Sequence, residues 1–255
     1  MRRGIAIAVF AAAVAALTPA HGEDLVSGLS QDQIEITSNY TGTDLVVFGA
    51  IEASGLEIVT AQPDVVVVVR GPDVDMTVRK KDRVAGVWIN RHEVKLGGMP
   101  GYYYLASTRP LDKIAPASVL RRYQLGTDNV QAAVTSPNDG APKVETYTAA
   151  AIRQQVKAGL YRQAPGGVEF LSNSLFRVRV PVPAAVPRGQ YTAQVYLFRN
   201  GNIVSAQSTP LFVDQIGLER RLFSFAHKWP LSYGFSVVAM ALMLGWISSI
   251  VFRRA

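Results

Sequence analysis

The sequence predicts a mainly β fold: immunoglobulin-like antiparallel sandwich modules, a helical insert and one C-terminal transmembrane helix. Short β-branched or alternating segments separated by Gly and Pro predict the sandwich. Two segments with helical periodicity predict the insert. No residue from Leu231 to Phe252 is charged, and Arg253 and Arg254 follow. A helix over that stretch is about 33 Å long, enough to cross a hydrocarbon core of about 30 Å.

The N-terminus has the pattern of a secretory signal peptide. Arg2 and Arg3 form a basic start, Ile5 to Leu17 is almost entirely apolar, and Thr18-Pro19-Ala20 supplies small residues for cleavage. An uncleaved N-terminal anchor is the alternative. In both cases the terminal arginines stay on the cytoplasmic side. The sequence therefore predicts that the middle of the chain is exported, into the periplasm or the extracellular space, and that the C-terminus stays in the cytoplasm.

Charge and cysteine content exclude several classes of function. The formal charge is +7, from 26 Lys and Arg against 19 Asp and Glu. Removing the four arginines at the two termini leaves 22 basic groups against 19 acidic ones, so the exported part is nearly neutral and no nucleic-acid partner is expected. The chain has no cysteine, which excludes thiol nucleophiles and thiolate metal sites.

Strands are expected in two regions with helices between them. The predicted strands are Gln33–Ser38, Leu45–Ile51, Asp64–Arg70, Val74–Arg79, Tyr102–Ser107, Phe176–Val180, Gln190–Arg199 and Asn202–Val213. The predicted helices are Pro116–Leu125 and Tyr147–Tyr161, with a loop at 129–143. Asn200-Gly201 predicts a type I′ hairpin turn.

These elements predict seven segments along the chain. They are a signal peptide (1–22), a first β-sandwich-like module (23–109), a helical and loop connector (110–165), a second β module (166–215), an amphipathic juxtamembrane segment (216–229), a transmembrane helix (230–252) and a cytoplasmic tail (253–255). The second β module is short for an independent sandwich. It either completes the first pair of sheets or packs on the helices.

Aromatic side chains of the first β region have two interpretations. Tyr102, Tyr103 and Tyr104 could form a recognition patch. Since neighbours on a strand point to opposite faces, packing of one face in the core is the preferred interpretation. Trp88 has the same two interpretations, and a core position is preferred because Trp in a sandwich is more often core than binding site.

The sequence contains no recognisable catalytic motif, and no catalytic residue, cofactor or complete metal site is predicted. His92-Glu93 begins like a zincin helix, but Leu96 stands where the second His is needed. A copper site is a weaker hypothesis. It combines a mature N-terminal His21 with His92 and Met99 as nitrogen and sulfur ligands. The alternative places His92 in an ordinary surface turn.

Two features near the C-terminus predict contact with the membrane and with a partner. The segment before the anchor is amphipathic, and its membrane-interface candidates are Arg220, Arg221, Phe225, Lys228 and Trp229. The alternative is a helix packed on the exported domain. Within the anchor, the small residues Ala241, Gly245 and Ser249 recur every four positions and predict a face for docking another helix, unless the anchor stands alone.

Several stretches of this chain resemble a known family. Ser38–Thr43 (SNYTGT), Pro187–Thr192 (PRGQYT) and the anchor from Tyr233-Gly234 to Gly245-Trp246 look like the alphaproteobacterial transmembrane proteins of unknown function. The resemblance covers nearly the whole mature chain. It implies a bacterial inner-membrane protein and supplies no catalytic motif.

The expected function is non-catalytic. The sequence favours a membrane-anchored periplasmic accessory or assembly protein that acts with another inner-membrane protein, of which a transporter is one candidate. Its expected partners are the lipid bilayer and either that membrane protein or a second copy of the chain, through the transmembrane helix. A periplasmic module that binds copper or a small ligand is the alternative, and a hydrolase ranks third.

Overall fold

The computed structural model describes residues 24–36, 40–52, 63–84, 86–134, 144–215 and 225–252. The strands are β1 (Asp24–Leu29), β2 (Gln33–Ile36), β3 (Thr43–Glu52), β4 (Asp64–Arg70), β5 (Asp73–Val84), β6 (Val87–Pro100), β7 (Tyr103–Ser107), β8 (Ala133–Val134), β9 (Tyr161–Pro165), β10 (Val168–Phe170), β11 (Leu175–Val182), β12 (Gly189–Arg199) and β13 (Asn202–Gln215). The helices are α2 (Leu111–Ile114), α3 (Ala117–Arg122), η1 (Thr127–Asn129), α4 (Val144–Lys157) and α6 (Pro230–Phe252).

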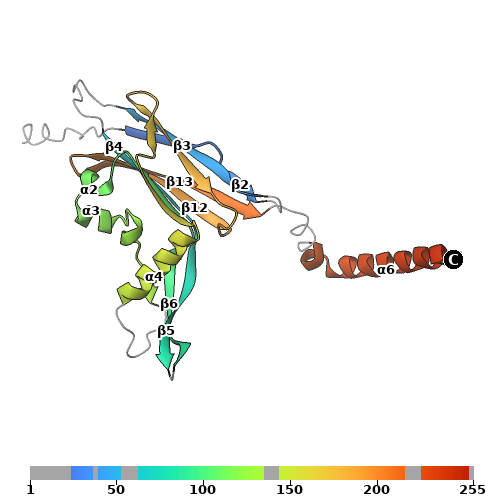
Figure 1. Ribbon diagram of the computed structural model, residues 1–255. Coiled ribbons are helices and arrows are strands. Elements are labelled where there is room, and N and C mark those ends of the chain that lie inside the picture. The colour runs from blue at the N-terminus through green and yellow to red at the C-terminus, as the bar shows by residue number, and fades with distance from the viewer. Residues whose placement is uncertain are drawn as a thin grey trace, which may run out of the picture.

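Two sheets face each other and form the predicted sandwich (Figure 1). One has the strand order β1-β3-β11-β10 and the other β2-β13-β12-β4-β7-β9. Most neighbours are antiparallel, as expected, but the two edge strands of the larger sheet, β2 and β9, pair in parallel with β13 and β7. The prediction of a mainly β fold with helices and a C-terminal apolar helix is confirmed.

Strands from both β regions lie side by side within each sheet. β3 pairs with β11, and β4 pairs with β12. The chain segments 23–109 and 166–215 therefore build one sandwich together, which answers the question that the sequence left open. β9 belongs to this sandwich as well, although it lies within the segment expected to be a connector.

The valine run of β4 occupies the middle of the larger sheet. Val65, Val67 and Val69 point into the core between the two sheets. Val66 and Val68 point to the opposite face, into a second core covered by α3, α4 and the base of β5 and β6. A strand buried on both faces needs a continuous apolar run instead of alternation, which is why five valines stand together.

The three consecutive tyrosines alternate between the same two cores. Tyr102 and Tyr104 lie between the sheets, where their hydroxyls donate to the carbonyl oxygens of Pro181 (2.6 Å) and Arg179 (3.0 Å) in β11. Tyr103 lies in the second core. All three side chains are at least 96% buried. Core packing is thus confirmed, on both faces of the strand.

Helix ends differ from the sequence prediction at two positions. The helix predicted to end at Tyr161 ends at Lys157 instead. Gly159 has a positive φ of 74°, and Tyr161 begins β9, where its hydroxyl donates to the Pro100 carbonyl at 2.6 Å. The helix predicted over 116–125 ends at Arg122, because Gln124 adopts a left-handed conformation with φ 52°.

Turn chemistry at the β12–β13 hairpin is as predicted. Asn200 has φ 50° and Gly201 has φ 82°, and Arg199 pairs with Asn202 across the turn. Positive φ at both central residues is the requirement of a type I′ turn.

β5 and β6 form a long two-stranded hairpin, called the arm below, that projects beyond the sandwich (Figure 1). Its base packs on the second core through Val94, Leu96 and Met99. The core position preferred for Trp88 is wrong, because its side chain is 65% exposed near the end of the arm. No strand or helix covers that end among the described residues.

Candidate functional site

The C-terminal helix α6 is the element with the clearest functional character. It has 23 residues, which corresponds to about 35 Å of helix. Its window Pro230–Ile250 is long and apolar enough to cross a membrane, and none of it is buried against the rest of the described chain. Large apolar side chains are exposed along it, including Leu231, Phe235 and Leu244. Such a surface is stable in lipid and not in water.

The three small residues predicted as a docking face all lie on α6. Ala241, Gly245 and Ser249 are exposed, and their spacing of four places them on one side of the helix. A Cβ built on Gly245 meets no atom within 4 Å. The chain itself therefore gives no packing reason for glycine there, and a partner helix could approach closely on this side.

The juxtamembrane candidates are described only in part. Arg220 and Arg221 lie outside the described residues. Residues 225–228 are helical, and Phe225, Lys228 and Trp229 are all exposed, with Trp229 at 65%. The Phe225 and Tyr233 rings meet edge to face with centroids 6.0 Å apart, on either side of Pro230. This contact packs the two rings together at the start of α6, and Trp229 stays exposed beside them.

Of the three proposed copper ligands, the structure describes the side chain of Met99. His21 lies outside the described residues, as does the side chain of His92, whose backbone pairs with Lys80 in the arm. Met99 is completely buried in the second core. The described residues include no group of three or more His, Cys, Asp or Glu placed to hold a metal ion. Met99 is a core residue here.

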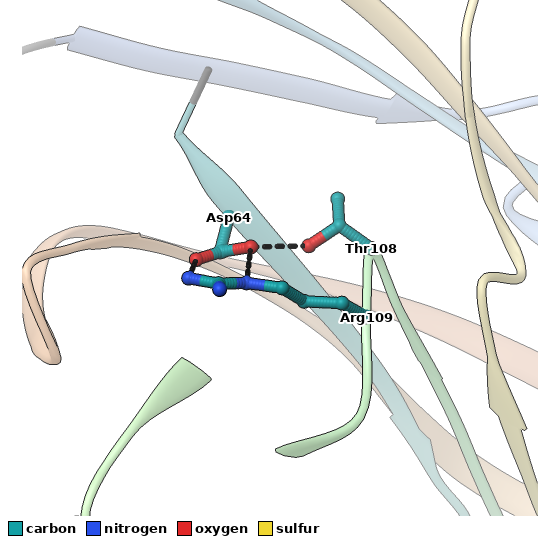
Figure 2. Close-up of polar contacts among 3 residues, drawn as sticks. All are labelled: Asp64, Thr108 and Arg109. Atoms are coloured by element: carbon teal, nitrogen blue, oxygen red, sulfur yellow. Dashed lines mark hydrogen bonds and ion pairs between the residues drawn. The ribbon is translucent and has the colours of Figure 1, made fainter. Parts of the chain in front are cut away.

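One polar cluster that the sequence did not predict joins the ends of two strands (Figure 2). Asp64 begins β4, and Thr108 and Arg109 follow β7. The carboxylate of Asp64 accepts hydrogen bonds from Thr108 Oγ1 (2.9 Å) and Arg109 Nε (2.7 Å), and its second oxygen accepts from the Arg109 guanidinium. The hydrogen bond to Asp64 and its negative charge raise the pKa of Arg109.

This cluster is structural in its geometry. Both carboxylate oxygens of Asp64 are occupied by neighbouring donors, so the group is not poised as a base. Val66 pairs with Ser107, so β4 begins where β7 ends. The available signal is the Asp before the valines and the Thr-Arg after the tyrosines. These residues come together only when β4 is paired with β7.

A hollow of about 620 Å³ lies between α4 and the segment that follows η1. Charged side chains at its wall are Asp128, Glu145 and Arg153, and Val130 and Ile152 supply apolar surface. Mixed polar and apolar walls of this size suit a small molecule. Sequence reasoning missed this hollow, because its two sides come from separate segments, 128–132 and 144–153.

Taken together, the sandwich and α6 define a class of protein: a β-rich domain followed by a C-terminal apolar helix that could cross a membrane. The sequence profile of the family described as "Putative transmembrane protein (Alph_Pro_TM)" matches residues 24–254. The chain belongs to this family, as its resemblance implied. No curated protein matches the chain.

Proposed function

We propose that this protein is a non-catalytic accessory or assembly partner of another bacterial inner-membrane protein, with a transporter as one such partner. The observation that carries the proposal is the unburied helix α6 with small residues along one face. Lipid provides no hydrophobic drive for helices to associate, so close packing against small residues is the means by which such a helix binds another.

The proposed topology follows from the distribution of arginines. Arg2 and Arg3 precede the apolar N-terminal stretch, and Arg253 and Arg254 follow α6. By the positive-inside rule both ends face the cytoplasm, and the sandwich faces the periplasm. A type I arrangement with the signal peptide removed is the simplest product of this pattern.

The test is affinity purification of the full-length protein from its native membrane in mild detergent, followed by mass spectrometry. We expect a stoichiometric membrane protein that is lost from the Gly245→Leu variant. Ala239→Leu is the matched control, since residue 239 lies roughly 120° around the helix from Gly245. Retention of every partner by Gly245→Leu, or loss from both variants alike, would contradict docking through this face.

A ligand-binding module remains the second candidate, and the hollow beside α4 is the observation that favours it. Arg153 at its wall offers a guanidinium for an anionic ligand. Thermal stabilisation of the purified protein by a panel of small carboxylates and phosphates, lost on Arg153→Ala, would support this function. Burial of Met99 makes copper the less favoured ligand.

A further inference from the structure

The outer half of the arm is free of the rest of the described protein. The arm's base packs on the second core up to Val78 and Val94, which are paired with each other. From there the two strands continue to the last pair, Val84 and Val87. At about 3.4 Å per residue, six residues carry the tip about 20 Å beyond the packed base.

The tip of the arm carries apolar side chains that no other part of the described chain covers. The exposed fractions are 40% for Val84, 63% for Val87, 65% for Trp88 and 43% for Ile89. Strand pairing places these residues within two positions of the last pair, Val84 and Val87, beside the turn at Gly86, which has φ 86°. The apolar groups therefore occupy roughly the last 7 Å of the arm. A two-stranded tip in water normally carries polar residues, so this surface calls for an apolar environment.

Cations lie beside and behind the apolar tip: Arg83 pairs with Trp88, and Lys81 and Lys80 precede it along β5. Lys80, Lys81 and Arg83 are exposed on β5. Asp82 is the acid among them, and its carboxylate lies 3.5 Å from the Lys80 ammonium. Farther back, Arg79 pairs with Glu93 at 2.8 Å. The outer half of the arm thus has an excess of positive charge placed about 3 to 14 Å behind its end.

The arm and the route to the membrane helix leave the sandwich at the same end. β4 and β13 both pair antiparallel with β12 and so run in the same direction. Thr192 of β12 lies opposite Arg70 on one side and Pro210 on the other. The arm starts three residues after Arg70, and β13 ends five residues after Pro210.

We propose that the tip of the arm, Val84 to Ile89, inserts into the headgroup region of the same bilayer that α6 spans, with anionic phospholipid held by Lys81 and Arg83. Apolar residues with Trp at the tip, Arg83 level with Trp88, and Lys81 and Lys80 farther back match the boundary between acyl chains and headgroups. Insertion stays shallow, because the outer edges of a two-stranded hairpin have unpaired backbone groups that hydrocarbon does not satisfy.

The absence of cysteine allows this contact to be measured in the full-length protein. A spin label on Val87→Cys reports the tip, and Val204→Cys is the matched control. Val204 is 40% exposed and lies in β13 next to the β12–β13 turn, at the opposite end of the sandwich. Each labelled protein is reconstituted alone into vesicles of phosphatidylcholine with phosphatidylglycerol. Relaxation by dissolved oxygen is then compared with relaxation by a water-soluble nickel chelate.

We expect the label at position 87 to favour oxygen over the nickel chelate severalfold relative to position 204. Lys81→Glu combined with Arg83→Glu should bring the ratio at position 87 close to that of the control, as should pure phosphatidylcholine. Equal ratios at 87 and 204 in the anionic vesicles would overturn the proposal. So would shielding of position 87 that appears in native membranes but not in vesicles, which would assign the tip to a protein partner. The vesicles contain no partner, so this outcome is independent of the accessory function proposed above.

Discussion

Four buried tyrosines use their hydroxyls to bind the backbone of other segments or turns. The hydroxyls of Tyr102, Tyr103, Tyr161 and Tyr191 donate to backbone carbonyls, at 2.5 to 2.9 Å. Tyr103 also accepts from the Gly126 amide at 2.9 Å. Burial raises the pKa of all four phenols well above its usual value. Ionisation of any of them would bury a charge and remove a donor.

These tyrosines predict a sharp loss of stability at alkaline pH. In the unfolded chain tyrosine ionises near pH 10. Because the folded protein holds the phenols neutral, their contribution is complete below about pH 10 and is lost as the pH rises further. Each phenol lowers the free energy of unfolding by about 1.4 kcal/mol per pH unit in that range. Four together reach a typical domain stability of about 5 to 15 kcal/mol between roughly pH 11 and 13.

Phenolate absorbance at 295 nm and far-ultraviolet circular dichroism, followed in one titration, check this expectation. We expect the absorbance of the buried tyrosines to rise only where the β signal disappears. The same titration in concentrated guanidinium chloride supplies the reference for free phenols. Ionisation of all the tyrosines with the dichroism unchanged would show that the four hydroxyls are accessible.

The tyrosine run also shows what a single stretch of sequence can predict. Alternation along the strand indicated that Tyr103 would oppose Tyr102 and Tyr104, and it does. The alternation does not predict which carbonyl oxygens accept hydrogen bonds from these hydroxyls. The acceptors for Tyr102 and Tyr104 belong to Pro181 and Arg179, more than 70 residues away on the other sheet. Their positions depend on how β11 is placed, which the local pattern does not contain.

At the scale of elements, the outer half of the arm makes few packing contacts with the described sandwich. Its inner half contributes to the second core, and the Gln155 amide lies 3.2 Å from the Met76 sulfur there. Its outer half contributes an exposed ion pair, Arg79 with Glu93. Ion pairs of this kind stabilise a protein by about 1 kcal/mol at most. Removal of the outer half of the arm should therefore change the free energy of unfolding little.

Shortening the arm tests that separation. Residues 79–93 are replaced by Asn-Gly, which joins the paired residues Val78 and Val94 through a two-residue turn. We expect the free energy of unfolding in urea to change by about 1 kcal/mol or less, because no core contact is removed. The matched control is Leu96→Ala within the inner half, which should cost about 2 to 5 kcal/mol. A loss from shortening as large as that of the control would place the outer arm in the core.

The sequence did not predict the arm, because Trp88 was assigned to the core and is exposed instead. An apolar residue on a predicted strand is assigned to the core on the assumption that the strand stays within the sandwich. Whether a hairpin extends past its neighbours depends on the length of those neighbours, and no residue near Trp88 carries that information. The dense charge of Arg79 to Arg83 was the available signal, since a strand that belongs to a core has few consecutive charged residues.

At the scale of the molecule, the fold is closed by pairings between its beginning and its end. β3 lies between β1 and β11, and β4 lies between β7 and β12. The inter-sheet core draws Leu45 and Val67 from the first region and Phe176 and Leu197 from the second. Gly49 of β3 leaves room for the Phe176 ring, because a Cβ at this position would lie 2.5 Å from Phe176 Cζ. Neither region has a complete core without the other.

This interdependence predicts that residues 23–109 do not fold when produced alone. Without β11 and β12, the central strands β3 and β4 each expose one row of backbone hydrogen-bonding groups and one side of the valine run. Unpaired apolar strand edges favour aggregation over folding. Residues 23–229, which keep both regions, are the control and should unfold in a single cooperative transition. Amide dispersion in a two-dimensional NMR spectrum distinguishes the outcomes. A well-dispersed spectrum from 23–109 would mean that the first β region folds by itself, and the sandwich would then have to assemble on a preformed half.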